Sequence, residues 1–124
     1  MKLFLFLALG GVLGTLARYG LQGLIQPQGG SFPWGTLVVN LSGSFALGFL
    51  MRYLLGSDLA TPEMRAAATI GFCGAFTTMS SFAYETVSLM NGGEYGRAAW
   101  YLLATIGGSL AATGAGLVAG RTLL

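Results

Sequence analysis

Four stretches of the chain are each long and apolar enough to cross a lipid bilayer, at about residues 3–24, 35–55, 65–90 and 97–121. A transmembrane helix needs about 20 such residues to span the hydrocarbon core. Only ten of the 124 side chains are charged, six Lys or Arg and four Asp or Glu, and 54% of the residues are hydrophobic. A soluble domain of this length could not cover so much apolar surface. We therefore expect an all-α membrane protein whose four transmembrane helices form one integral domain over residues 1–124.

Turn-rich connections separate these stretches at residues 26–33, 56–63 and 91–94. Glycine, proline and small polar residues in such clusters are typical of loops. In the second connection, Thr61 followed by Pro62 is typical of an N-cap and a first helical position. The third helix is therefore expected to begin there.

The basic residues divide unevenly between the two ends of a four-span bundle. Lys2, Arg52, Arg65 and Arg121 fall on one side, whereas Arg18 and Arg97 fall nearer the other. Because cytoplasmic ends are richer in lysine and arginine, four against two favours cytoplasmic termini. So small a difference is equally compatible with insertion in both orientations.

Few side chains could support enzyme chemistry. The chain has no histidine and a single cysteine, Cys73, so it offers neither an intramolecular disulfide nor a tetrahedral zinc site. Asp58, Glu63 and Glu94 fall in connections, and only Glu85 lies near a membrane segment. The serines lack a candidate base to activate them. A net charge of +2 from scattered residues does not indicate a nucleic-acid surface. We expect no catalytic residue and no nucleic-acid partner.

Residues 71–82 (GFCGAFTTMSSF) place glycines and hydroxyls in the middle of an uncharged apolar segment. In hydrocarbon, irregular backbone is tolerated only where it is buried in protein or lines a polar cavity. Met79 and Phe82 stand three residues apart and so share a helix face, a spacing more often used for packing than for a ligand. We interpret this stretch as the functional centre.

Two further polar features lie inside predicted spans. Asn40 would be costly at membrane depth unless it faces a pore or pairs with another helix, and both readings remain open. In the fourth span, Tyr101, Thr105, Ser109 and Thr113 recur every four residues and share a slowly winding face. A single Ser or Thr usually bonds its own helix backbone. Four such side chains on one helix face favour a row of hydrogen-bond donors along an ion pathway.

Taken together, segments 10–19, 35–43 and 71–85 and the row from Tyr101 to Thr113 resemble the small fluoride channels called Fluc or CrcB over nearly the whole chain. The resemblance implies a four-helix subunit with a broken third helix, assembled as an antiparallel dual-topology homodimer in the cell membrane. It also implies passive fluoride export that confers fluoride resistance, and a structural sodium ion at the dimer centre.

The resemblance also implies roles for individual positions. The carbonyl oxygens of Gly74 and Thr77 from both subunits would hold the sodium ion, and oxygen ligands suit a hard cation. The fluoride pathway would comprise Asn40, Met79, Phe82, Tyr101, Thr105, Ser109 and Thr113, with Arg18 and Glu85 at the pore entrance.

One position departs from the family pattern. Where the family typically has Thr-Thr-Phe-Ser-Thr-Phe, this chain reads TTMSSF, so Met79 replaces the first aromatic residue. A phenyl edge carries partial positive charge and can face an anion, whereas a thioether is polarisable but lacks that edge. We hypothesise that Met79 preserves the constriction and alters the rate or the anion preference.

Two other classes remain open. A small four-helix multidrug or guanidinium-type exporter has a similar length. Coupled cation export, however, normally needs a carboxylate within the bundle, and Glu85 is the only carboxylate near a membrane segment. A non-transporting assembly subunit would use the polar rows only to hold helices together.

Overall fold

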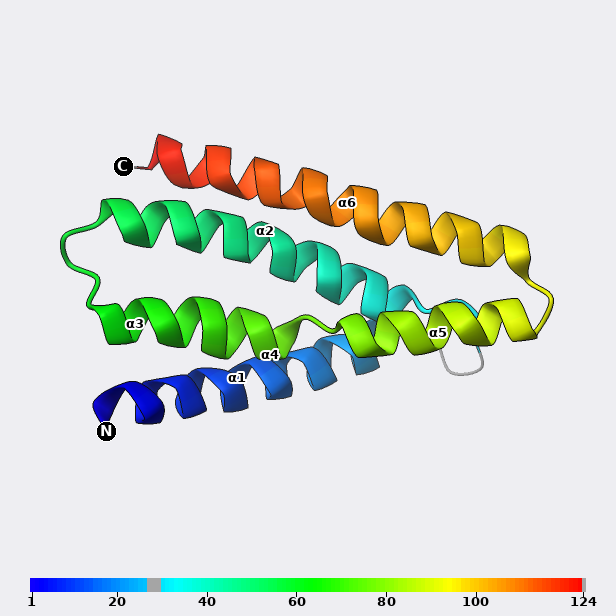
Figure 1. Ribbon diagram of the computed structural model, residues 1–124, viewed down its shortest axis with the longest axis horizontal. Helices are drawn as coiled ribbons and strands as arrows, with labels where there is room; N and C mark the ends of the chain where they lie inside the picture. Colours follow the sequence, from blue (N-terminus) through cyan, green and yellow to red (C-terminus); the bar gives the residue numbers. More distant parts are fainter. Residues whose placement is uncertain (27–29, 124) are drawn as a thin grey trace.

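The computed structural model describes residues 1–26 and 30–123, so that residues 27–29 of the connection predicted at 26–33 lie outside the described ranges. Within these ranges the chain folds into helices packed side by side (Figure 1). The elements are α1 (Lys2–Ile25), α2 (Trp34–Gly56), α3 (Pro62–Ala66), η1 (Ala67–Cys73), α4 (Gly74–Phe76), α5 (Met79–Asn91) and α6 (Tyr95–Thr122). Elements α3, η1, α4 and α5 follow one another and together form one candidate membrane span, which we call the third rod. With α1, α2 and α6, the bundle has four rods.

All four rods are long and apolar enough to span a membrane: Lys2–Ile25, Trp34–Gly56, Pro62–Asn91 and Tyr95–Thr122. This confirms the all-helical, four-span prediction, and the helices extend one to three residues beyond the expected ranges. Large apolar side chains cover the outer surface, among them Leu13, Leu103 and Leu110. Such a surface suits contact with lipid rather than water. Both chain ends lie at the same end of the bundle as the α2–α3 connection (Figure 1).

The third rod begins as predicted and then departs twice from a regular α-helix. Thr61 Oγ1 accepts a hydrogen bond from Met64 N at 3.3 Å, and Pro62 occupies the first turn, which confirms the expected N-cap. From Ala67 to Cys73 the backbone widens into a π-helix, which the sequence did not suggest. After Phe76, Thr77 and Thr78 have extended backbone angles, with ψ of 156° and 109°. Helix α5 then starts under a new cap, since Thr78 Oγ1 accepts from Ser81 N at 3.1 Å.

Close contact between helix backbones depends on glycine at a few positions. A Cβ atom on Gly14 of α1 would collide with the backbone carbonyl of Phe72 in η1, and one on Gly116 of α6 would collide with that of Phe45 in α2. Small residues let membrane helices approach closely enough for extensive van der Waals packing. Glycine at these two positions therefore permits tight packing within the subunit.

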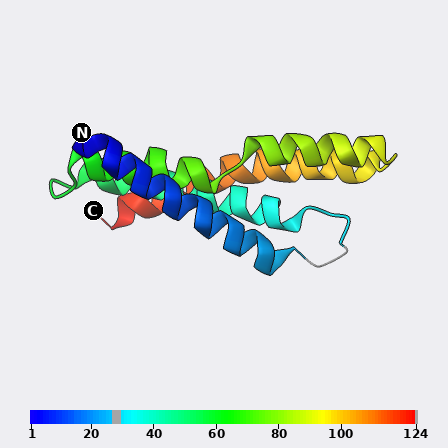
Figure 2. The same cartoon turned by 90° about the horizontal axis from the view of Figure 1, so that it is seen from below.

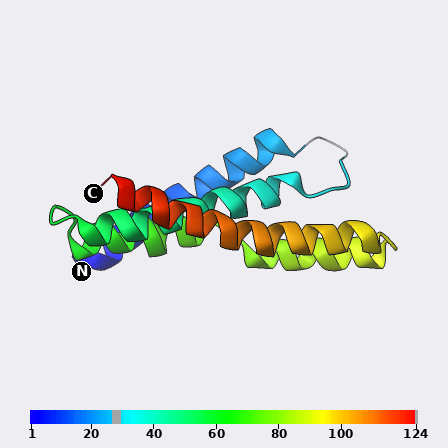
Figure 3. The ribbon, with the colours of Figure 1, turned by 90° about the horizontal axis from the view of Figure 1, so that it is seen from above.

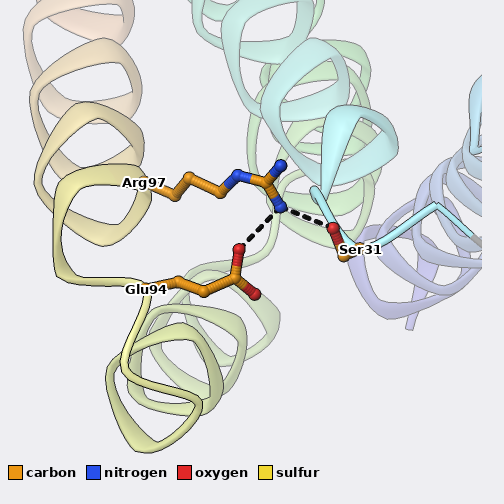
Figure 4. A network of polar contacts seen from close by, with 3 residues as sticks. All are labelled: Ser31, Glu94 and Arg97. Atoms are coloured by element: carbon orange, nitrogen blue, oxygen red, sulfur yellow. Dashed lines mark hydrogen bonds and ion pairs between the residues drawn. The ribbon is translucent and has the colours of Figure 1, made fainter.

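Towards the end of the bundle that carries the α5–α6 turn, the pair α1–α2 diverges from the pair α5–α6 (Figures 2 and 3). The residues before α2 nevertheless contact the start of α6. Arg97 Nη1 donates to Glu94 Oε2 at 2.6 Å and to Ser31 Oγ at 2.7 Å (Figure 4). Phe32 packs on Trp100 with ring centroids 5.2 Å apart. These contacts link the segment before α2 to the first turn and a half of α6.

Candidate functional site

Asn40 of α2 is paired with the extended backbone between α4 and α5. Its Nδ2 donates to the Thr78 carbonyl at 3.1 Å, and its Oδ1 accepts from Thr78 N at 2.8 Å. Both residues are buried, with 7% and 5% of their surface exposed. A buried backbone group that loses its helical partner must find another. Asn40 supplies both partners, and the second hydrogen on its Nδ2 remains available to another acceptor.

Beside this pair lies a groove of about 360 Å³ bounded by α2, the start of α5 and the middle of α6. Most of the predicted pathway residues line it, although they come from three different helices. The lining includes Asn40, Thr77, Thr78, Met79, Phe82, Thr105, Ser109 and Thr113. The structure therefore brings these predicted residues together around one space.

Thr105 carries a groove hydroxyl that is both buried and without a partner within the described ranges. It is 5% exposed, and its Oγ1 has no hydrogen-bond partner among the described residues. By contrast, Thr113 Oγ1 lies 2.9 Å from the Ser109 carbonyl and bonds its own helix. A buried hydroxyl without a partner is costly, by about 1–3 kcal/mol. Because Thr105 also contributes to the groove wall, its unused hydroxyl is a candidate donor to a polar ligand or water.

Met79 and Phe82, which were both expected to line the fluoride pathway, differ in burial. Phe82 is 3% exposed and packs edge-on against Tyr101, with ring centroids 5.1 Å apart. Met79 also lines the groove, but 72% of its surface is exposed. In the single chain, Phe82 is therefore fixed by packing, whereas Met79 stands at the open side of the groove.

A second, polar space of about 420 Å³ lies where the helix pairs diverge, and we call it the outer chamber. Its lining includes Gln22, Thr36, Glu85, Ser88 and Glu94. Thr36 Oγ1 donates to Glu85 Oε1 at 2.8 Å, and Tyr101 Oη donates to Glu85 Oε2 at 2.7 Å. One carboxylate is thus held by hydroxyls from α2 and α6.

The structure separates some residues that the sequence grouped together. Tyr101 belongs to the predicted row on α6, yet it contacts Glu85 at the outer chamber rather than lining the groove. Arg18, expected at the pore entrance with Glu85, lies beside the interruption of the third rod, where its Nη1 is 3.5 Å from the Thr77 carbonyl. Sequence reasoning missed Gln22 and Thr36. Each stands four residues from a residue that was singled out, Arg18 and Asn40 respectively, and that spacing could have found them.

The interruption also changes the partners of two backbone carbonyls. In a continuous helix, Gly74 O would accept from Thr78 N, which here donates to Asn40. Likewise Thr77 O would accept from Ser81 N, which here donates to the Thr78 side chain. No cluster of His, Cys, Asp or Glu in the described part of the chain could hold a metal ion. The Gly74 carbonyl thus loses its helical donor, whereas the Thr77 carbonyl accepts from Arg18 Nη1 at 3.5 Å. Backbone carbonyl oxygens are ligands of the kind that hard cations prefer.

The sequence was compared with those of known proteins. The family described as "CrcB-like protein, Camphor Resistance (CrcB)" matches residues 5–117. A protein of Geobacter sulfurreducens is 43% identical over 124 residues, which cover 99% of this chain and 100% of that one. One of Thermus thermophilus is 46% identical over 86% of this chain and 85% of its own, and one of Methanopyrus kandleri is 56% identical over 67% and 63%. All three carry the name "Fluoride-specific ion channel FluC".

Proposed function

This chain belongs to the CrcB-like protein family, and we propose that it is a fluoride-selective passive channel of the cell membrane. Its four spanning helices make it a multi-pass membrane protein. Similar relatives that cover almost all of the chain are named for fluoride conduction, which supports the same function here. The protein would then transport an ion rather than catalyse a reaction.

One observation carries the proposal within this molecule. Thr105, whose buried hydroxyl has no partner in the described part of the chain, lines a groove that is also lined by Asn40 and Ser109. Fluoride is strongly hydrated, so a pore must replace its water with fixed donors and still release the ion. Neutral donors provide this without the tight binding that a fixed cation would give. The groove has such donors, and Thr105 is one that the fold leaves unused.

Passive conduction is sufficient to protect a cell. A membrane potential of about 100 mV, negative inside, is worth roughly 2.3 kcal/mol per charge, enough to keep an anion about fiftyfold lower in the cytoplasm. Such a channel would confer fluoride resistance with no energy source other than the membrane potential. Coupled cation export would instead need a carboxylate free to exchange protons, whereas Glu85 accepts hydrogen bonds from two hydroxyls.

We further propose that the channel is an antiparallel dual-topology homodimer. Met79 lies largely exposed on the open side of the groove, so a second copy could cover it and complete the pathway. A structural sodium ion would sit at the centre of this dimer, held by the Gly74 and Thr77 carbonyls of both subunits. The Gly74 carbonyl has lost its helical donor, which fits that role, whereas the Thr77 carbonyl would have to exchange its contact with Arg18 for the ion. The ion would supply positive charge that binds the two interruptions together.

The test is ion efflux from liposomes that contain the purified protein. Vesicles are loaded with fluoride or with chloride, and ion-selective electrodes record release when valinomycin dissipates the potassium potential. We expect rapid fluoride release and no chloride release above that of protein-free vesicles. Absence of fluoride release from folded protein would reject the channel. Proton-coupled cation transport that Glu85→Gln abolishes would favour an exporter instead.

A further inference from the structure

One face of α1 follows the third rod and then reaches α2. Along it, residues spaced by four make successive contacts: Gly14 packs on the Phe72 backbone, Arg18 Nη1 lies 3.5 Å from the Thr77 carbonyl, and Gln22 Nε2 donates to Thr36 Oγ1 at 3.0 Å. This spacing keeps all three on one side of the helix. The last of these contacts joins the chain of hydrogen bonds that ends on Glu85.

Counting hydrogens fixes the direction of that chain. Thr36 has one hydroxyl hydrogen, which it donates to Glu85 Oε1. Because Gln22 Nε2 is only a donor, Thr36 cannot donate in return and must accept from it. Tyr101 donates its own single hydrogen to Glu85 Oε2. Glu85 therefore accepts at both oxygens, and Gln22 determines the orientation of one of the two donors.

Two carboxylates line the outer chamber, and both are held. Glu94 is paired with Arg97, and Glu85 with Thr36 and Tyr101. A mobile carboxylate would oppose an anion in this space, since like charges repel strongly where water is limited. Thr36 has an alternative orientation, because a helical threonine readily donates to a carbonyl of its preceding turn. The contact from Gln22 favours donation to Glu85.

We infer that Gln22 is a positioning residue of the fluoride pathway: its amide fixes the Thr36 hydroxyl as a donor to Glu85 and so holds that carboxylate at the chamber wall. The inference rests on the proposed channel function and adds a residue to it. Gln22 acts through Thr36 and need not touch the ion.

The test compares fluoride efflux rates per reconstituted channel for three substitutions. Gln22→Leu removes the donor, and we expect the rate to fall about threefold to tenfold, the range that corresponds to one hydrogen bond. Gln22→Glu keeps the shape but replaces the donor with an acceptor that competes with Glu85 for the Thr36 hydrogen. At neutral pH we expect Gln22→Glu to lower the efflux rate at least as much as Gln22→Leu does. Thr36→Val removes the intermediate hydroxyl and should lower the rate to a similar extent.

A double-mutant cycle then separates positioning from packing. In the Thr36→Val background, Gln22→Leu should change the rate by less than about twofold, because its effect passes through the missing hydroxyl. Gln22→Met serves as the second apolar variant if Gln22→Leu does not fold. The inference is overturned if an apolar variant conducts at the wild-type rate, if Gln22→Glu does so, or if the Gln22 and Thr36 effects simply multiply. A wild type that conducts no fluoride would instead reject the channel itself, so the two failures are distinguishable.

Discussion

Asn40 and Thr78 are joined by two hydrogen bonds, so that one side-chain amide satisfies both the N–H and the carbonyl of a residue in extended backbone. An amide side chain presents a donor and an acceptor at the spacing of a peptide group, which lets it replace a missing helical neighbour. The interruption between α4 and α5 therefore depends on a residue of α2, 38 positions earlier in the chain.

Asn40→Leu should destabilise the protein by about 1–3 kcal/mol for each Thr78 group left buried without a partner, and should lower fluoride conduction. The free energy of unfolding in detergent and the efflux rate measure the two effects. Ser42→Ala is the matched control on the same helix, since the Ser42 hydroxyl bonds its own backbone at Val38 O. The account fails here if the two variants are equally stable.

Substitutions at Thr105 and Thr113 should affect fluoride conduction and protein stability differently. Thr105→Val removes a buried hydroxyl without a partner, so stability should be unchanged or higher. Fluoride efflux should fall about tenfold or more, because a hydrogen bond to an ion is worth about 1.5–3 kcal/mol. Thr113→Val loses a bond within the protein and should cost about 0.5–1.5 kcal/mol of stability. An unchanged efflux rate in Thr105→Val would show that fluoride does not bind the Thr105 hydroxyl on its way through the protein.

Met79→Phe should change the fluoride rate, or the preference for fluoride over chloride, because it adds an aromatic edge at the open side of the groove. Parallel fluoride and chloride efflux measure both quantities. Ile70→Phe adds the same ring to an exposed position that does not line the groove, and should alter neither. Equal flux and selectivity in wild type and Met79→Phe would remove this hypothesis.

Gly14→Ala should destabilise the protein by about 1–3 kcal/mol, because its Cβ would meet the Phe72 backbone and separate α1 from η1. Gly20→Ala on the same helix meets no atom within 4 Å and should be neutral or stabilising, by up to about 1 kcal/mol from helix propensity. Denaturation midpoints in detergent compare the two. Equal midpoints would show that α1 does not pack as closely as described.

Sodium should stabilise the assembled channel if the Gly74 and Thr77 carbonyls bind it. A ligand at a hundred times its dissociation constant adds about 2.7 kcal/mol to the folded state. Thermal unfolding is therefore measured in sodium chloride and in choline chloride at equal ionic strength. A higher midpoint in sodium is expected, and identical midpoints at all concentrations would argue against the proposed ion.

The sequence predicted the spans because long apolar runs in a membrane protein allow little besides helices. The Thr61 cap was also predictable, since its signals are adjacent in the chain. The π-helix at Ala67–Cys73 was not, because no local pattern marks it; its backbone lies against Gly10 and Gly14 of α1. The groove residues were proposed through a family resemblance. Gln22 and Thr36 were missed because their importance depends on a contact between two helices.

The most direct test of a passive fluoride-selective channel is its reversal potential in a planar bilayer. With a tenfold fluoride gradient and equal chloride on both sides, the current carried by the wild-type protein should reverse at the fluoride equilibrium potential, about 59 mV from zero. A coupled exporter would not follow this potential, and a non-selective pore would reverse closer to zero. Reversal near zero, or fluoride flux without a current, would contradict the account.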